Sequence, residues 1–433
     1  MRIIATGDRL FEETFRRITG RGRVFDVRIR RTVKKIVDDV ARRGDAALFA
    51  YAKQLDQTDL DAASVEVSAA EWEEASARVI QDDMAVLQLA CRRINAFHQR
   101  QTIQSWSCTD EDGVEMGQMA LPLEKIGVYA PGGLAAYPST VLMAAIPATI
   151  AGVKEILLVT PVKGGGALNP LIAVAARLSG VTRIFKIGGA QAIAALAYGT
   201  ESVPRVDKIV GPGNAYVSAA KRMVYGVVAI DMIAGPSEVL IIADGAADAS
   251  FIAADLLAQA EHDEMASGIL LTPDENLARR VASEVDARLA QLPKQAVAGR
   301  SLEAYGAIVL TQDLHEALAL ANRFAPEHLE LMVEKPQILL AGVRHAGAVF
   351  LGGFTPEAVG DYLAGPNHIL PTGGTARFSS PLGVYDFIKR TSVLSFSAAA
   401  LDRYGDQAEH FARIEGLDGH ARSLAVRRDI KKP

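Results

Sequence analysis

The sequence predicts an α/β protein built on parallel sheets, and three observations support this class. Between residues 124 and 224, short apolar runs alternate with helix-like segments, and Gly-rich turns separate them. Apolar runs of strand length recur in the second half of the chain. Hydrophobic residues occupy 49% of the 433 positions, which is enough for large buried cores and for two or three domains. Strands that alternate with helices at this spacing form βαβ units and parallel sheets.

The N-terminal third predicts helices and little chemistry. Amphipathic helices are expected over residues 8–19 and 27–55, and a polar helix over 70–99. Residues 101–123 are rich in Thr, Ser, Gln and acids, which favours a short hairpin or a linker. The first residues lie outside any obvious core pattern, so we expect an arm that packs on a partner subunit. The apolar face predicted for the second helix consists of Val33, Ile36, Val37, Val40 and Ala41.

In the middle of the chain, three predicted strands lead into Gly-rich turns. Gly lets backbone amides approach a phosphate closely, and the dipole of the following helix favours an anion. Because ligands of parallel sheets bind at the carboxyl ends of the strands, these turns predict a dinucleotide site. None of them matches G-x-G-x-x-G, and ordinary turns remain the alternative. The turns are Pro131-Gly132-Gly133, Gly188-Gly189 and Gly211-Pro212-Gly213-Asn214.

The second half of the chain continues the alternation. Buried strands are predicted at residues 239–243, 307–310 and 348–351. Helices are expected at about 247–263 and at 274–291, the latter charged and on the surface. Beyond residue 378 we expect helical structure with looser spacing.

An acid and an imidazole stand side by side at Glu327 and His328, just after a proline. Ala325 precedes that proline and is expected to be extended. The next five residues alternate like a strand, which puts the pair at a loop-to-strand junction. Glu and His suit acid–base catalysis near neutral pH, and two solvated surface residues are the alternative. Asp361 and His368 follow in Gly-rich turns.

One helix carries a possible metal pair. Gln259 and His262 are three residues apart and share a helix face, a spacing that suits two ligands of one ion. The alternative is that His262 is an exposed cation at a helix end. Ser237, in a turn before a strand, could bind substrate or cap the chain. Glu415 and His420 stand near the end of the chain, far in sequence from these clusters.

Composition and charge exclude several classes. The chain has 46 basic and 51 acidic residues and a net charge of -5, which argues against a nucleic-acid or anionic-membrane partner. No apolar run approaches the ~20 residues that span a bilayer, and the N-terminus has no signal-peptide core. With Cys91 and Cys108 as its two cysteines, the chain has no disulfide framework. We expect a cytoplasmic protein.

Taken together, the motifs resemble histidinol dehydrogenase in order and spacing, from about residue 10 to residue 427. One departure is Leu134, at a position where many relatives carry a basic residue. The motifs are Pro131-Gly132-Gly133, Tyr137-Pro138-Ser139, Gly188-Gly189-Ala190-Gln191-Ala192, Gly211-Pro212-Gly213-Asn214, Ala234-Gly235-Pro236-Ser237-Glu238, Gln259-Ala260-Glu261-His262, Pro326-Glu327-His328 and Gly365-Pro366-Asn367-His368-Ile369-Leu370-Pro371.

The resemblance implies a fold and an assembly. The fold class would be α/β, with two incomplete Rossmann-like parallel-sheet domains, small helical extensions at both ends and an intertwined homodimer. The implied domains are an N-terminal helical arm (1–25), an NAD-binding domain (129–237), a substrate and metal domain (26–128 with 238–377) and a C-terminal helical dimerisation tail (378–433).

The resemblance also implies site residues, carried over position by position. Glu327 and His328 would be the catalytic acid–base pair. One zinc ion per subunit would be held by Gln259, His262, Asp361 and His420 of the partner subunit. NAD would contact Tyr129, Gln191 and Asn214. The substrate would contact Ser237, Gln259, His262, Glu327, Asp361, His368, Glu415 and His420.

The implied reaction is the NAD-dependent oxidation of L-histidinol through L-histidinal to L-histidine, the last step of histidine biosynthesis. Two alternatives remain open. The first is a zinc- and NAD-dependent dehydrogenase of the same fold that acts on another alcohol, such as a sulfonated diol. The second is a zinc hydrolase in which Glu327 activates water and the Gly-rich turns serve only the fold.

Overall fold

The computed structural model describes residues 1–20, 27–132, 136–162 and 166–428. Gly133 of the first Gly-rich turn, and Leu134 directly after it, lie outside the described residues. The chain divides into two compact units. The first comprises Met1–Gln101 and Leu123–Phe387, and the second Thr102–Pro122 and Ile388–Pro433. Within the described ranges, no helix is both long enough and apolar enough to cross a membrane.

The predicted alternation of strands and helices in the middle of the chain is confirmed as a five-stranded sheet in the first unit. Its strand order is β6-β5-β4-β7-β8, and every neighbouring pair is parallel. The strands are β4 (Lys125–Tyr129), β5 (Glu155–Val159), β6 (Arg183–Phe185), β7 (Lys208–Val210) and β8 (Ala229–Ile230). The helices between them are α6 (Pro138–Ala151), α7 (Pro170–Ser179), α8 (Gly189–Tyr198) and α9 (Ala215–Val224).

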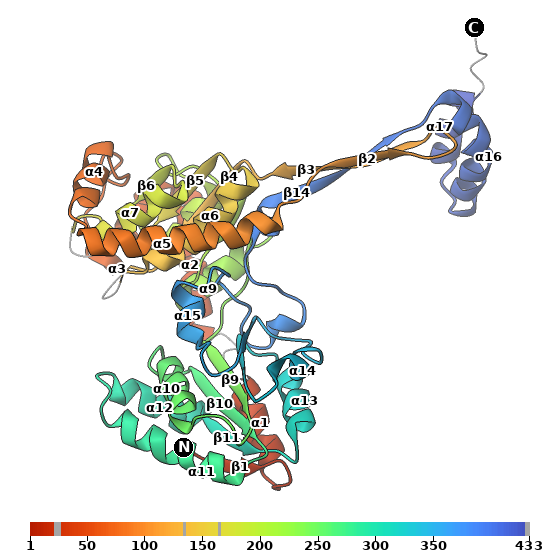
Figure 1. Cartoon of the computed structure of the whole chain (residues 1–433). Helices are drawn as coiled ribbons and strands as arrows, with labels where there is room; N and C mark the ends of the chain where they lie inside the picture. Colours follow the sequence, from red (N-terminus) through yellow and green to blue (C-terminus); the bar gives the residue numbers. More distant parts are fainter. Residues whose placement is uncertain (21–26, 133–135, 163–165, 429–433) are drawn as a thin grey trace. The chain divides into compact units, whose positions relative to one another are not determined.

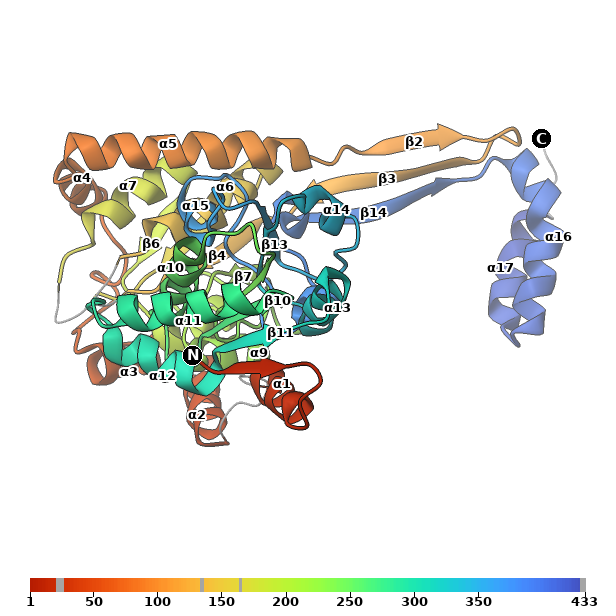
Figure 2. The ribbon, with the colours of Figure 1, turned by 60° about the horizontal axis from the view of Figure 1, so that its bottom comes forward.

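Alternate residues of this sheet point to opposite faces and enter two hydrophobic cores. Leu158 packs on one face with α6 and α7, whereas its neighbours Leu157 and Val159 pack on the other face with α8 and α9. The N-terminal helices complete the layers, with α4 and α5 joining the first core and α2 and α3 the second (Figure 2). Strands buried on both faces explain why this region reads as continuous apolar runs.

Two of the predicted long helices are each broken into two. The helix expected over 27–55 is α2 (Val27–Arg43) followed by α3 (Asp45–Asp56), because Gly44 between them has a φ of 54° that an L-residue rarely adopts. The helix expected over 70–99 is α4 (Ala69–Ala77) and α5 (Gln81–His98), with Ile80 extended between them and the short η1 (Gln99–Gln101) after them. The predicted apolar face of α2 is buried except for Ala41, which is exposed.

A six-stranded parallel sheet forms the other half of the first unit. Its order is β1-β11-β10-β9-β12-β13, with α10–α12 on one face and α1, α13 and α14 on the other (Figure 1). The strands are β1 (Ile3–Ala5), β9 (Glu238–Ala243), β10 (Ser267–Thr272), β11 (Ala307–Leu310), β12 (His328–Met332) and β13 (Ala348–Leu351). The helices are α1 (Phe11–Gly20), α10 (Ala249–Ala260), α11 (Glu275–Leu289), α12 (Gln295–Tyr305), α13 (Leu314–Phe324) and α14 (Pro336–Leu340).

The N-terminus belongs to this sheet, and its expected position outside the core is wrong. Ile3–Ala5 pairs in parallel with β11 as the edge strand. Phe11, Phe15 and Ile18 of α1 are buried in the core beneath it. A strand of three residues is too short to produce a periodic pattern, so it cannot be predicted from hydrophobic periodicity.

The second unit is a small antiparallel sheet followed by two helices. β2 (Trp106–Thr109) and β3 (Glu115–Pro122) form the expected hairpin, and β14 (Ile388–Ser395) pairs with β3 along its whole length. The expectation of helical structure past residue 378 is therefore wrong for β14, and holds for α16 (Ala398–Ile414) and α17 (Asp418–Arg428). Seven of the eight residues of β14 are exposed, so no buried–exposed alternation marks the strand in the sequence.

We predict that Gly44→Ala lowers stability by about 1–3 kcal/mol, because the new residue must adopt a strained backbone conformation. A Cβ at this position would also collide with the Glu201 carboxylate, which accepts the N–H of Asp45 at 2.8 Å. Urea unfolding of both variants measures the change. Gly7→Ala is the control, because a Cβ there meets no atom within 4 Å. Equal stability of the two variants would contradict the prediction.

Candidate active site

Glu327 and His328 lie at the amino end of β12, next to Glu238 at the start of β9. The Glu327 carboxylate accepts the backbone N–H of Glu238 at 2.9 Å, and the Glu238 carboxylate accepts the backbone N–H of Glu327 at 3.2 Å. Glu238 also accepts the N–H of Gly373 at 3.2 Å. All three residues of the two strand ends are buried. The sequence-adjacent acid and imidazole are thus held by an exchange of hydrogen bonds between two neighbouring strands.

The orientation of the His328 ring follows from one hydrogen bond. Its Nδ1 lies 3.0 Å from the backbone oxygen of Glu238, and because a carbonyl only accepts, Nδ1 carries the proton. Nε2 is then the basic nitrogen, and it is buried without a hydrogen-bond partner in the described part of the chain. Burial lowers the pKa of His328 to about 3, so the ring is neutral near pH 7. A neutral imidazole with an unprotonated Nε2 can accept a proton.

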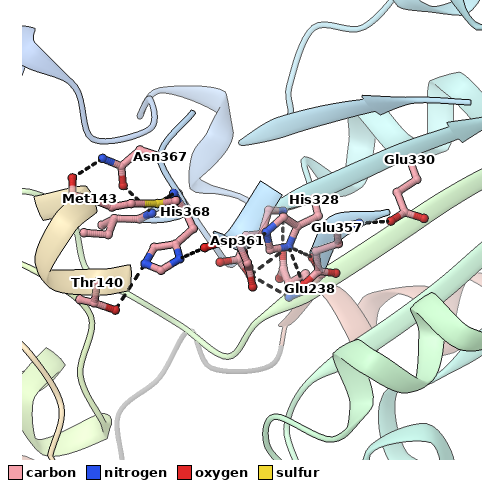
Figure 3. A network of polar contacts seen from close by, with 11 residues as sticks. Thr140, Met143, Glu238, His328, Glu330, Glu357, Asp361, Asn367 and His368 are labelled. Atoms are coloured by element: carbon pink, nitrogen blue, oxygen red, sulfur yellow. Dashed lines mark hydrogen bonds and ion pairs between the residues drawn. The ribbon is translucent and has the colours of Figure 1, made fainter. Parts of the chain in front are cut away.

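The helix α15 (Glu357–Tyr362) supplies two carboxylates to the same place, so Asp361 lies on a helix and not in the expected turn. One Glu357 oxygen lies 3.6 Å from His328 Nδ1, and one Asp361 oxygen lies 4.0 Å from Nε2 (Figure 3). Burial raises the pKa of Asp361 to about 6 and raises the pKa of Glu357 well above the ordinary carboxyl range. One buried and one partly buried acid at this spacing favour a cation close by.

His262 completes a group with metal-ligand spacing. Ligand atoms of His262, Glu357 and Asp361 all lie within 4.8 Å of one another. Gln259, in the last turn of α10, is fully buried, whereas His262 lies two residues beyond the end of that helix and is exposed. The predicted helix 247–263 therefore ends before His262. Oxygen and imidazole donors of this kind suit zinc and similar divalent ions, so the residues present fit the implied metal.

Sequence reasoning missed Glu238, Glu330 and Glu357. A usable signal existed for Glu357, which precedes Asp361 by four residues and so shares its helix face. Glu330, expected only as part of a strand, is buried on β12 and accepts the backbone N–H of Glu357 at 2.9 Å. Its carboxyl lies against that of Asp255 on α10, and burial raises the pKa of both groups, that of Asp255 to about 6. Glu330 thus anchors the first residue of α15.

The backbone before Glu327 differs from expectation. Ala325 is in the left-handed region with a φ of 55°, not extended, although a proline follows it. It ends α13, and its N–H bonds to the oxygen of Ala321 at 2.8 Å. The helix-capping bond therefore outweighs the local preference for an extended residue before proline.

His368 and its neighbour Asn367 link α15 to α6. His368 Nδ1 lies 3.1 Å from the backbone oxygen of Asp361, and Nε2 lies 3.3 Å from the hydroxyl of Thr140 (Figure 3). The Asn367 side chain donates to the backbone oxygen of Met143 at 2.6 Å. Burial lowers the pKa of His368 to about 4. The loop that carries His368 thus joins the helix of the predicted metal ligand Asp361 to a helix of the five-stranded sheet.

Ser237 directly precedes β9 and is partly buried, and its backbone oxygen accepts the N–H of Ser267 at 3.1 Å. Glu415 and His420 belong to the second unit. Glu415 caps the C-terminus of α16, His420 lies in the first turn of α17, and both are exposed. The first unit therefore brings together Glu327, His328, Asp361 and His262, while the predicted residues Glu415 and His420 come from a separate compact unit.

The predicted NAD residues lie at the carboxyl ends of the strands of the five-stranded sheet, whereas Glu327 and His328 lie at the amino end of a strand in the six-stranded sheet. Tyr129 ends β4, and its hydroxyl accepts the N–H of Gly189 at 3.2 Å. Asn214 follows β7 and caps α9 through its side-chain oxygen. Gln191 lies in the first turn of α8 and donates to Asp56 at 3.1 Å, and its own carbonyl oxygen is a buried acceptor without a partner among the described residues.

This edge has the geometry that parallel sheets use for nucleotides. From β4 the chain adds β5 and then β6 on one side, and afterwards it crosses back to add β7 and then β8 on the other side. The order in which strands are added therefore reverses between the neighbouring strands β4 and β7. Ligands bind at such a reversal. A cavity of about 370 Å³ opens at the ends of β4 and β5, with Gly132, Pro161 and Asn169 in its lining, although it does not include the three predicted NAD residues. The residues present fit a bound dinucleotide.

Comparison with known proteins agrees with this description. The family model for histidinol dehydrogenase matches residues 20–428. The histidinol dehydrogenase of Syntrophotalea carbinolica is 55% identical over 427 residues, covering 99% of each chain. That of Geobacter sulfurreducens is 52% identical over 428 residues, covering 99% of this chain and all of the relative. The crystal structure of histidinol dehydrogenase from Elizabethkingia anophelis superposes with a TM-score of 0.92 at 38% identity, covering 99% of this chain and 98% of that one.

A family model that matches nearly the whole chain, relatives above half identity over the full length and a shared fold lead to one conclusion. The chain belongs to the histidinol dehydrogenase family of NAD-dependent oxidoreductases in histidine biosynthesis.

Proposed function

We propose that the chain oxidises L-histidinol through L-histidinal to L-histidine in two successive two-electron steps at one site. The observation that carries this proposal is the group of Glu327, His328, Asp361 and His262 at the amino edge of the six-stranded sheet, in which Glu327 and His328 are buried, Asp361 is partly buried and His262 is exposed. It combines a neutral imidazole base, a carboxylate that accepts the backbone N–H of Glu238, and donors with metal spacing. Alcohol oxidation needs a base, and aldehyde oxidation needs water activation.

Zinc, held by Gln259, His262, Asp361 and His420 of the partner subunit, would bind the amino alcohol through its amine and imidazole, and NAD would accept hydride in each step. His328 Nε2 takes the hydroxyl proton as the alcohol becomes the aldehyde. Glu327 then removes a proton from the water that adds to the aldehyde, and the hydrate is oxidised to the carboxylate. Ser237, His368 and Glu415 would contact the substrate, and Tyr129, Gln191 and Asn214 would contact NAD.

Attack by water, and not by a cysteine, suits this chain. Cys91 is half-buried on α5, where its thiol lies 3.5 Å from the backbone oxygen of Leu178. Burial raises the pKa of that thiol, which lowers its fraction of nucleophilic thiolate. Cys108, on β2, belongs to the second unit.

The homodimer, the division into NAD and substrate domains and the cytoplasmic location remain predictions. A dimer would give His420 and Glu415 a purpose, because these exposed residues of the second unit would complete the site of the partner. The exposed apolar side chains of that unit, which include Trp106, Leu394, Phe411 and Ile414, support a partner there.

The first test is the amount of NADH formed per L-histidinol consumed by zinc-loaded protein, followed by absorbance. We expect two NADH per substrate, because alcohol and aldehyde are both oxidised. One NADH would mean that the aldehyde is released. If histidinol gives no NADH but another alcohol, such as a sulfonated diol, does, then that alcohol is the substrate. Hydrolysis without NADH formation would favour the hydrolase alternative.

Glu327→Gln should separate the two steps. Glutamine retains an oxygen that accepts the N–H of Glu238, so the strand ends keep their geometry, but it cannot take a proton from water. We expect the oxidation of histidinal to fall by about 100-fold or more and the oxidation of histidinol to be retained to a large extent. Single-turnover assays started from each substrate measure the two rates. Equal loss of both would refute this division of roles.

Mixed dimers test whether His420 completes the site of the other subunit. A His262→Ala chain and a His420→Ala chain are each expected to lose tight zinc binding as homodimers. When co-expressed with different tags and purified as a mixed dimer, they should recover one intact site, with about half of the wild-type zinc content and activity per dimer. A mixed dimer as zinc-poor and inactive as both parents would place His420 in the site of its own chain. A His420→Ala homodimer that keeps tight zinc binding would place His420 outside the site.

A further inference from the structure

The turn Gly211-Pro212-Gly213-Asn214 is held by an ion pair that no proposed catalytic or metal role uses. Lys221, on α9, and Asp231, directly after β8, form a salt bridge whose side chains are 3% and 1% exposed. The Lys221 ammonium donates to the backbone oxygen of Gly211 at 2.9 Å. The Asp231 carboxylate accepts the backbone N–H of Gly211 at 2.8 Å. Both polar groups of one glycine are thus bound by the two charges of one buried pair.

Gly211 has little freedom to move between its neighbours. Its φ of 113° lies in the region that favours glycine, and a Cβ there would collide with the backbone oxygen of Tyr129. The carboxylate of Asp231 accepts a further backbone N–H from Met232 at 2.6 Å, which fixes the acid itself. The ion pair therefore holds the main chain of the turn next to the end of β4. This is the point where the order in which the chain adds strands to the sheet reverses.

The other end of the turn is fixed by Asn214. Its side-chain oxygen accepts the N–H groups of Tyr216 and Val217 at 3.0 and 3.1 Å, so the amide Nδ2 is the group of that side chain suited to donate to a ligand. Asn214 and Tyr129 are two of the three proposed NAD contacts. Among the described residues, the ion pair makes no hydrogen bond to either side chain. It binds the backbone of Gly211, which lies against the backbone of Tyr129 and precedes Asn214 in the same turn.

We propose that Lys221 and Asp231 are positioning residues that preorganise the Gly211–Asn214 turn and thereby increase the affinity for NAD. This inference rests on the proposed NAD site at that turn. Two charges removed from water are costly unless they satisfy each other and further hydrogen bonds, and here both do. A turn fixed before the ligand arrives does not lose conformational freedom on binding, so part of the cost of association is avoided.

The test is the double variant Lys221→Met with Asp231→Asn. It leaves no buried unpaired charge, and the asparagine oxygen can still accept the N–H of Gly211, so stability should recover relative to either single variant. The oxygen of Gly211 loses its charged donor, however, and we expect the Kd for NAD to rise roughly three- to tenfold. Calorimetry with NAD alone measures the Kd. The KM for histidinol and the zinc content should not change.

Lys208→Met is the matched control. Lys208 is a buried lysine at the other end of β7, and it pairs with Asp386 at 3.1 Å and with the backbone oxygen of that residue at 2.8 Å. Its loss should lower the melting temperature without changing the Kd for NAD. A double variant that melts like the wild type and binds NAD like the wild type would overturn the inference. If the wild-type protein itself binds no NAD at millimolar concentration, the proposed NAD site is what fails.

A second measurement needs no variant and decides the matter if the double variant does not fold. In hydrogen–deuterium exchange of the wild-type protein without NAD, the Gly211 amide should exchange as slowly as the amides of β7, because it donates to a buried carboxylate. Fast exchange of that amide, with protection only after NAD is added, would show that NAD orders the turn and would overturn the inference.

Discussion

The candidate site depends on the hydrogen bonds that Glu238 and Glu327 exchange across β9 and β12. At the start of two parallel strands, each carboxylate accepts the backbone N–H of the other residue. The exchange fixes the distance between the strand ends, and the backbone oxygen of Glu238 then fixes the His328 ring through Nδ1. The direction in which the basic nitrogen Nε2 points is therefore determined by the pairing of β9 with β12 and not by the rotamer preference of the side chain alone.

The two sheets of the first unit use opposite edges. In the five-stranded sheet, the predicted NAD residues stand at the carboxyl ends of the strands, as is usual for parallel sheets. In the six-stranded sheet, Glu238 and His328 stand at the amino ends of their strands. Because α10 returns the chain from β9 to the start of β10, the last turn of the helix brings Gln259, and the turn after the helix brings His262, to that same amino edge.

Buried charge is compensated in two different ways in this unit. At Lys221 and Asp231 the chain supplies both signs, and the pair is complete within the fold. Around α15 the chain supplies acids, and burial raises the pKa values of Glu357 and Asp361. A bound divalent cation would offset that cost and return the acids to their charged forms. The first arrangement suits a fixed support and the second suits a ligand site.

The sequence by itself determined the α/β class, most strands of both parallel sheets, and the pairing of Glu327 with His328. Each of these features depends on residues that are close together in the sequence. Hydrophobic periodicity and adjacency are local signals. It also identified the family, since motifs spread over the chain keep their order and spacing. The breaks at Gly44 and Ile80 escaped it, because the apolar spacing continues across them.

Only the tertiary structure decided how these parts meet. Glu238 and Glu327 are 89 residues apart in the sequence. Lys221 binds the backbone oxygen of Gly211, which lies ten residues earlier and before the start of α9. β14 becomes a strand because β3, far earlier in the chain, offers it a partner edge. Glu330 and Glu357 acquire their roles through burial and a backbone contact. Contacts between distant residues, and the loss of water around them, leave no periodic pattern in a single sequence, so only the folded chain defines them.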